Sequence, residues 1–284
     1  MIPANFDYQS PRTLSEALDL LGSNADAKVL AGGHSLLPAM KLRLAQPAML
    51  VDIGRIGGLS YIRESGEQIA IGAMTTHVEI ANSSLLHSAS PLLALAAAQI
   101  GDTQVRNRGT IGGSLAQAHP AADYPAAILA LDAEMVTHRR SGERRIPASS
   151  FFTGMFSTAL GHDEILTEIR VPKTTGEAIA YQKVHHPASG FAVVGVAVRL
   201  KTSGAKIESA AIGITGVSEI AYRAKAVESA LRGKTVSDLK EAAGHVTDNV
   251  DVIGDYYASA EYRKHLAAVI TRRALSQALS ANKR

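Results

Sequence analysis

The sequence predicts an α+β fold, in which strands and helices occupy separate runs of the chain. In the last third, three apolar, strand-like segments are followed by three segments with apolar residues at helical spacing. Strands followed by helices in this order are typical of α+β domains, not of a βαβ repeat. The expected strands are 178–184, 191–200 and 207–215, and the expected helices are 223–231, 236–245 and 261–279.

The N-terminal region predicts a small unit that ends at a pair of glycines. A helix is expected over 14–21, because Thr13 and Glu16 have the spacing of a capping box. A short apolar strand, 28–31, then leads through Gly32-Gly33 into a helical pattern over 36–44, and a second apolar run covers 49–53. We place a boundary at the glycine pair 57–58 and expect three units, at 1–57, 58–175 and 176–284.

The middle unit combines strands, helices and one long loop. The sequence predicts a strand over 68–71, a helix over 91–100 that begins with Pro91, and a helix over 124–131. Segments 135–138 and 145–147 form a predicted hairpin across Ser141-Gly142, and 165–171 is a further strand. Segment 101–122 has little periodicity and is expected to be a functional loop.

Composition narrows the classes of function. The 284 residues include 29 basic and 26 acidic side chains, a balance too even to indicate a nucleic-acid partner. The basic residues between 138 and 145 are expected to be a solvated hairpin rim, with a docking patch as the alternative. The longest apolar stretch is too short to span a membrane, and the N-terminus has no signal pattern, so a cytoplasmic location is expected. With no cysteine, the chain cannot hold a conventional iron–sulfur cluster.

Two glycine motifs have the residue types of a diphosphate site. The first, 31–36 (AGGHSL), lies between a strand and a helix, where glycines and a helix N-terminus can bring N–H groups close to an anion. A plain tight turn is the alternative, with His34 as a packing residue. The second motif, 106–114 (RNRGTIGGS), offers the same donors, and Asp123 follows it either as a helix cap or as an acceptor for a ligand hydroxyl.

Together these motifs resemble one family. AGGHSL and TIGGS, with IGAMTT between them, are similar to the FAD-binding medium subunit of the carbon monoxide dehydrogenase and xanthine dehydrogenase family of molybdenum hydroxylases. The resemblance runs the whole length of the chain, through LTEIRVP at 166–172. It implies a two-part FAD-binding domain of the vanillyl-alcohol-oxidase (PCMH) type and a C-terminal α+β domain of the CO dehydrogenase flavoprotein type.

The resemblance implies noncovalent FAD and a set of contact residues, with no catalytic residue and no metal ligand on this chain. Lys183 and the strand end at Ile165 and Leu166 are expected near the flavin ring. Phe191 is expected either over that ring or in the core of a buried strand. The full implied set is Leu30, Ala31, Gly32, Gly33, His34, Ser35, Leu36, Thr110, Ile111, Gly113, Ser114, Gln117, Asp123, Ile165, Leu166, Lys183 and Phe191.

The resemblance also implies partners. A large subunit would carry the molybdenum cofactor and a small subunit the [2Fe–2S] clusters, in a dimer of heterotrimers. This chain would pass electrons from the clusters to an external acceptor, with the small subunit docked beside 101–120. The alternatives are a self-sufficient FAD-dependent oxidoreductase on the same fold and a scaffold that binds no flavin.

Overall fold

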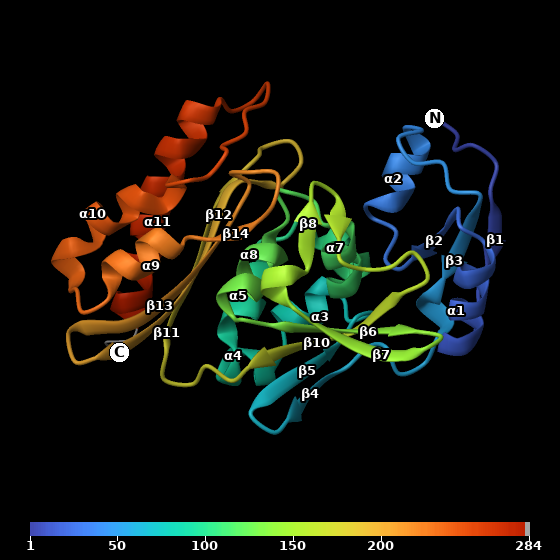
Figure 1. The fold of residues 1–284 in the computed structure, drawn as a ribbon, viewed down its shortest axis with the longest axis horizontal. Helices are drawn as coiled ribbons and strands as arrows, with labels where there is room; N and C mark the ends of the chain where they lie inside the picture. Colours follow the sequence, from blue (N-terminus) through green and yellow to red (C-terminus); the bar gives the residue numbers. More distant parts are fainter. Residues whose placement is uncertain (282–284) are drawn as a thin grey trace.

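The structure is a computed structural model that describes residues 1–281. The three larger of the four sheets in the described part of the chain lie side by side along its long axis (Figure 1). The predicted α+β class is confirmed. The C-terminal unit proposed at 176–284 extends past the described residues by its last three.

The N-terminal lobe holds a three-stranded parallel sheet in the order β1-β3-β2. Here strands and helices do alternate, because β1, α1, β2, α2 and β3 follow one another along the chain. The Thr13 side chain caps α1 by accepting a hydrogen bond from the Glu16 N–H, as predicted. The elements are β1 Asp7–Gln9, α1 Leu14–Ser23, β2 Ala27–Leu30, α2 Leu36–Lys41, β3 Met49–Asp52 and the short 3-10 helix η1 Ile53–Arg55.

The middle sheet is antiparallel, with the order β4-β5-β10-β6-β7. Strand β10 enters its centre from a distant part of the sequence, which buries both of its faces. The predicted hairpin and the strands at 68–71 and 165–171 are confirmed. The elements are β4 Ile62–Ser65, β5 Gln68–Gly72, β6 Glu134–Arg139, β7 Gly142–Pro147, η2 Ala148–Ser150, the small hairpin β8 Phe152–Gly154 with β9 Ser157–Thr158, and β10 Ile165–Pro172.

Six helices belong to the middle region, and two of them, α6 and α7, correct the expected loop at 101–122. Asp102 caps α6 by accepting from the Val105 N–H, and Thr110 caps α7 by accepting from the Gly113 N–H. The buried side chains of Ile111 and Leu115 hold α7 against the core. The helices are α3 His77–Ala81, α4 Ser84–Ala89, α5 Pro91–Ala98, α6 Thr103–Arg108, α7 Ile111–Gln117 and α8 Asp123–Ala130.

The C-terminal region is an antiparallel meander, β11-β12-β13-β14, followed by helices, as predicted. The helix expected over 236–245 is shorter than predicted: only residues 239–244 are α-helical, and a 3-10 turn lies at each end. The elements are β11 Ala178–His185, β12 Ala192–Ser203, β13 Lys206–Thr215, β14 Tyr222–Arg223, α9 Lys225–Leu231, η3 Val236–Asp238, α10 Leu239–Gly244, η4 His245–Thr247 and α11 Ala260–Ala281.

The C-terminal sheet lies between its own helices and helix α8 of the middle region (Figure 1). Gly213 on β13 lets the backbone of α8 approach, since a Cβ there would overlap the carbonyl group of Ala126. The loop 118–122 is also bonded to this sheet. Its carbonyls at Pro120 and Ala121 accept from the N–H groups of Gly216 and Ala192 (2.9 and 3.1 Å). The middle and C-terminal regions are therefore joined by a continuous set of contacts.

Candidate functional site

The first glycine motif leaves its backbone donors open. Gly33 has φ of +79°, a conformation that favours glycine, and it turns the chain from β2 into α2. Among the described residues, no acceptor is recorded for the N–H groups of residues 32–36, and the Ser35 hydroxyl makes no cap bond. His34 contacts its own turn, with Nδ1 3.3 Å from the Gly32 carbonyl oxygen. These exposed amides can therefore bind an anion.

The second motif uses its donors within the protein, unlike the first. The N–H groups of Ile111 and Gly112 donate to the carbonyls of Thr75 and Ala73, which belong to the IGAMTT segment. The Gly113 N–H donates to the Thr110 hydroxyl. Gly113 lies in helical backbone and needs no positive φ. The amides of Ile111, Gly112 and Gly113 are therefore not free to bind a ligand, and the glycines of this motif let it pack closely against Ala73 and the first motif.

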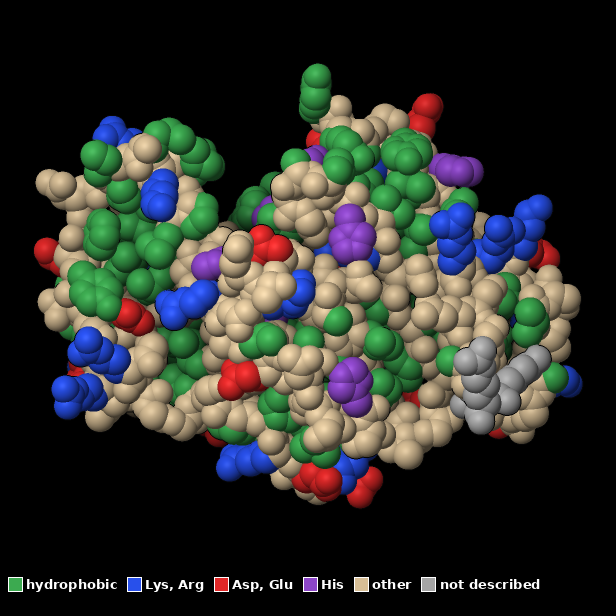
Figure 2. Space-filling view, turned by 180° about the vertical axis from the view of Figure 1, so that it is seen from behind, with side chains coloured by type: hydrophobic (Ala, Val, Ile, Leu, Met, Phe, Trp, Pro, Cys, Tyr) green, Lys and Arg blue, Asp and Glu red, His purple; other side chains and the backbone are tan. Residues whose placement is uncertain are grey.

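The two motifs touch each other. A Cβ on Gly32 would overlap the carbonyl of Arg108, and a Cβ on Gly113 would lie 3.5 Å from the Ala31 Cβ. Figure 2 shows a hollow between the N-terminal lobe, at the left of that view, and the rest of the molecule. Ser114 and Gln117 are partly exposed and lie one helical turn apart on α7. The junction of the lobes is thus a cradle lined by glycines, amides and small polar groups.

Asp123 and Lys183 form a buried ion pair. Asp123 is the first residue of α8, and Ala122 occupies the N-cap position, so Asp123 is not the cap. Its carboxylate accepts from the Lys183 ammonium at 2.9 Å and from the Tyr181 hydroxyl at 2.6 Å. The side chain of Lys183 is fully buried and also donates to the Gln99 carbonyl. Burial raises the pKa of Asp123, and Lys183 and Tyr181 oppose that shift.

Phe191 lies outside the core. It precedes β12, is 38% exposed, and stacks on His119 with ring centroids 4.1 Å apart and planes within 6°. The alternative of a buried strand residue is therefore wrong. His119 accepts at Nδ1 from the Ala121 N–H, which leaves its Nε2 to carry the proton of the neutral ring. Burial lowers the pKa of His119.

Ile165 and Leu166 are not joined to Lys183 or Phe191 by any recorded contact among residues 1–281. Ile165 packs in the core of the N-terminal lobe, and Leu166 packs in the core under the middle sheet. They begin β10, where Glu164 accepts from Arg144 (2.6 Å) and from the Thr137 hydroxyl. The predicted residues therefore fall into four places: the glycine cradle, the Asp123–Lys183 ion pair, the stack of Phe191 on His119, and the start of β10.

The sequence did not single out His77 or the exposed Arg108. His77 lies under the second motif, where its N–H donates to the Gly109 carbonyl and its Nδ1 is 3.2 Å from the Tyr124 hydroxyl. No sequence pattern distinguishes His77 from the other histidines of the chain. Arg108 stands inside the quoted motif, but only the structure shows that its backbone supports Gly32.

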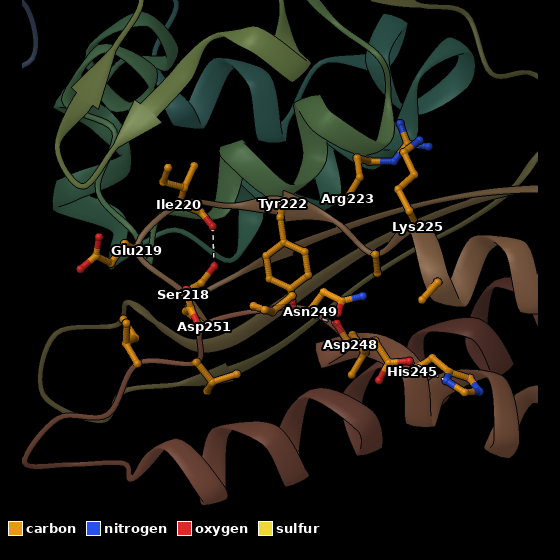
Figure 3. A pocket seen from close by; sticks show the side chains of 16 residues that line it. Ser218, Glu219, Ile220, Tyr222, Arg223, Lys225, His245, Asp248, Asn249 and Asp251 are labelled. Atoms are coloured by element: carbon orange, nitrogen blue, oxygen red, sulfur yellow. Dashed lines mark hydrogen bonds and ion pairs between the residues drawn. The ribbon is translucent and has the colours of Figure 1, made fainter.

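A separate cavity of about 720 Å³ opens beside β14 and α9 (Figure 3). None of the predicted residues lines it. Some of its polar side chains have partners: Arg223 pairs with Glu228 of α9, His245 pairs with Asp248, and the Tyr222 hydroxyl donates to the Val246 carbonyl. The cavity is therefore separate from the site formed by the glycine motifs, with which it shares no lining residue.

Comparison with known proteins assigns the family. Residues 4–174 match the family described as the FAD binding domain in molybdopterin dehydrogenase, and residues 179–278 match the CO dehydrogenase flavoprotein C-terminal domain. The chain belongs to the FAD-binding medium subunits of the molybdenum hydroxylases. The medium chain of Hydrogenophaga pseudoflava carbon monoxide dehydrogenase is 42% identical over 284 residues, which are 98% of either chain.

Other relatives agree with this assignment of a medium subunit. The glyceraldehyde dehydrogenase medium chain of Sulfolobus acidocaldarius is 36% identical over 98% of this chain and 99% of its own. A chain in a structure of carbon monoxide dehydrogenase from Hydrogenophaga pseudoflava superposes with a TM-score of 0.95 and 42% identity over 99% of either chain. For quinoline 2-oxidoreductase from Pseudomonas putida 86 the TM-score is 0.94 and the identity 31%, over 99% and 100% of the two chains.

The residues of this medium subunit fit FAD. Open amides at 32–36 suit a diphosphate, and the contact at Gly32 brings the second motif alongside them. The family assignment and this cradle together identify FAD as the cofactor. Within residues 1–281, no helix is long and apolar enough to cross a membrane.

Proposed function

We propose that this medium subunit relays electrons from the [2Fe–2S] clusters of a small subunit to an external acceptor. A large subunit with the molybdenum cofactor would oxidise the substrate, and two such heterotrimers would form the complex. FAD, when bound, can take up electrons singly and release them as a pair. The observation that carries the proposal is a diphosphate cradle on a chain without cysteine, which confines cluster chemistry to another chain.

The proposed contacts follow the geometry of the chain. The amides of 32–36 would bind the diphosphate, flanked by Leu30 and Ala31, while Thr110, Ile111 and Gly113 let it approach α7. Ser114 and Gln117 would bind hydroxyl groups of the cofactor. Lys183, held by Asp123, would place a positive charge near the ring, and Phe191 would stack on it. Ile165 and Leu166 would contact the ligand where β10 begins.

We further propose that the chain is organised as 1–57, 58–175 and 176–284. The three main sheets fall within these ranges, and β3 and β4 lie on either side of the first boundary. FAD would then lie between the first two units, with the third supplying Lys183 and Phe191.

The test compares the isolated chain with the assembled complex under anaerobic conditions. In the isolated chain, dithionite should bleach the flavin band, and organic substrates of molybdenum hydroxylases should not, because no substrate-oxidising centre is present. In the complex, the substrate should bleach the same band within the turnover time. Stopped-flow absorbance measures both, and heat or acid should release the flavin as free FAD.

Two results would contradict the relay. Rapid bleaching of the isolated chain by an organic substrate would instead support a self-sufficient FAD-dependent oxidoreductase. A complex whose flavin stays oxidised while its iron–sulfur clusters are reduced would show that electrons do not pass through this chain.

A further inference from the structure

The imidazole of His77 packs directly against the second glycine motif. His77 is the first residue of α3 and is 4% exposed, and its N–H donates to the Gly109 carbonyl at 2.9 Å. Beside it, Thr76 and Thr110 form an isolated bridge, so α3 and α7 begin side by side (Figure 1). The start of α3 and the second motif therefore form one unit, and the His77 ring lies inside it.

The His77 ring requires a glycine at position 109. The φ of Gly109 is −61°, which any residue adopts, so its backbone conformation does not require glycine. A Cβ on Gly109 would lie 2.5 Å from Nε2 of His77 and 2.7 Å from its Cδ2, whereas the next atom, the Val105 carbonyl oxygen, would be 3.2 Å away. The imidazole is therefore the group that excludes a side chain at this position.

Gly109 connects this ring to the first motif. The Cα of Gly109 would lie 2.9 Å from a Cβ on Gly32, so the two glycine backbones pack against each other. Gly32 in turn belongs to the segment 32–36, whose N–H groups have no recorded acceptor among the described residues. A change in the volume of the side chain at position 77 therefore reaches the open amides through the backbones of two glycines.

Tyr124 sets the orientation of the His77 ring. Its hydroxyl lies 3.2 Å from Nδ1 of His77, and its side chain is fully buried. Burial raises the pKa of Tyr124 well above its ordinary value, so the hydroxyl keeps its proton. Within residues 1–281 no other partner of this hydroxyl is recorded, so it donates to Nδ1, and Nε2 carries the proton of the neutral ring. The edge formed by Nε2 and Cδ2 is thereby held against Gly109.

The ring acts through its shape and not through its charge. Burial, and to a smaller extent His34 and Arg106, lowers the pKa of His77, so the ring is neutral at pH 7. No acceptor for its Nε2–H is recorded in the described part of the chain. The contact with Gly109 is therefore close packing, in which a change of even one atom is felt by the neighbouring backbone.

We propose that His77 is a positioning residue of the glycine cradle, an inference that rests on the proposed diphosphate contacts of segment 32–36. The neutral ring fixes the backbone of Gly109, and Gly109 fixes Gly32 where its neighbours can present their amides to an anion. In this arrangement His77 touches no ligand atom. Its effect passes through the diphosphate site, so FAD and ADP should feel it alike.

Two substitutions separate the two edges of the ring. His77→Asn keeps an amide in the place of Nδ1, as a partner for Tyr124, but leaves the space against Gly109 empty. His77→Gln fills that space and gives up the bond to Tyr124. In calorimetric titrations of the apo form of the full chain, His77→Asn should weaken FAD binding about tenfold and His77→Gln less than about threefold. A merely structural role predicts the reverse order, because a buried hydroxyl without a partner lowers stability.

Gly109→Ala tests the same contact from the other side. Its methyl group would overlap the ring and should weaken FAD binding about tenfold. The double variant His77→Asn/Gly109→Ala should bind FAD within about threefold of the wild type, because the methyl group occupies the vacated space. His87→Asn is the matched control, since His87 is exposed on α4 and bonds only to the Ala81 carbonyl among the described residues, and it should keep the wild-type affinity.

ADP provides the decisive comparison, because it carries the diphosphate without the flavin ring. Each variant should change the affinities for ADP and for FAD by the same factor. Wild-type affinity in His77→Asn, losses that multiply in the double variant, or a loss confined to FAD would each overturn the positioning role. Gly32→Ala separates this failure from failure of the proposed contacts: if it also binds FAD and ADP normally, the first motif is not the diphosphate site.

Discussion

Gly32 is the residue at which the two glycine motifs meet. Its hydrogen in place of a side chain lets the carbonyl of Arg108 and the Cα of Gly109 pack against it. We expect Gly32→Ala to separate the two motifs, because the Cβ would overlap backbone atoms that cannot move without displacing the end of α6. FAD retention should fall at least tenfold, as measured by the ratio of flavin to protein absorbance after gel filtration.

Gly57 offers a matched control for Gly32. A Cβ at Gly57 meets no atom within 4 Å, and its φ is not positive. Gly57→Ala should therefore keep its FAD. Equal flavin content in both variants would show that contact between the motifs is not required for binding.

His77 is a second residue whose properties depend on its surroundings, because its buried position changes its pKa. Burial, with smaller contributions from His34 and Arg106, lowers its pKa from 6.5 to about 4. Between these values the unfolded chain binds more protons than the folded one, so stability falls as the pH is lowered from about 6.5 towards 4. By pH 5 this effect should cost about 2 kcal/mol.

The variant His77→Gln removes that titration. Urea unfolding at pH 7 and pH 5 should show a smaller difference in the free energy of unfolding for the variant than for the wild type, by about 2 kcal/mol. An unchanged difference would mean that His77 is protonated in the folded protein at pH 5.

Ion pairs connect neighbouring elements, and the burial of each pair decides how much its loss lowers the free energy of unfolding. Lys183 of β11 and Asp123 of α8 have side chains that are 0% and 4% exposed, whereas Lys173 and Glu64 form an ion pair of similar length with 28% and 60% exposure. Removing one partner of a buried pair leaves an uncompensated charge. Lys183→Met should therefore lower the free energy of unfolding by about 3 kcal/mol.

The surface pair is the control for this prediction. Lys173→Met should change the free energy of unfolding far less than Lys183→Met does, because solvent screens an exposed pair. Chemical denaturation of both variants at pH 7 provides the comparison. Equal changes would indicate that solvent reaches the Lys183 pair.

Elements with local signals were predicted well from the sequence. The Thr13 cap of α1 and the 203–204 turn between β12 and β13 depend only on neighbouring residues. Strand β1 was missed because its three residues are exposed and its partner β3 lies about 40 positions further along the chain. Helix α7 was missed because Gly112 and Gly113 lower helix propensity, while the tertiary packing of Ile111 and Leu115 compensates for it.

At the scale of the whole molecule, the sequence indicates the site's parts but not how they meet. Both glycine motifs were recognisable, yet the contact of Gly32 with Arg108 depends on how two lobes pack. The same holds for the stack of His119 on Phe191, whose residues are 72 positions apart. Which backbone amides stay free also depends on residues far along the chain. The carbonyl groups of the IGAMTT segment accept hydrogen bonds from the N–H groups of the second motif, and the sequence does not show this pairing.

The bonds between loop 118–122 and the C-terminal sheet limit how this chain can be recombined with its relatives. The chain passes from one family region to the next near residue 175, but the contacts between the two regions continue from Ala192 and Gly216 back to Pro120 and Ala121. A chimaera with its crossover at 175 would pair a foreign sheet with a native loop and a native α8. Segments 118–130 and 178–216 are thus best exchanged as one inherited unit, although they are separate in sequence.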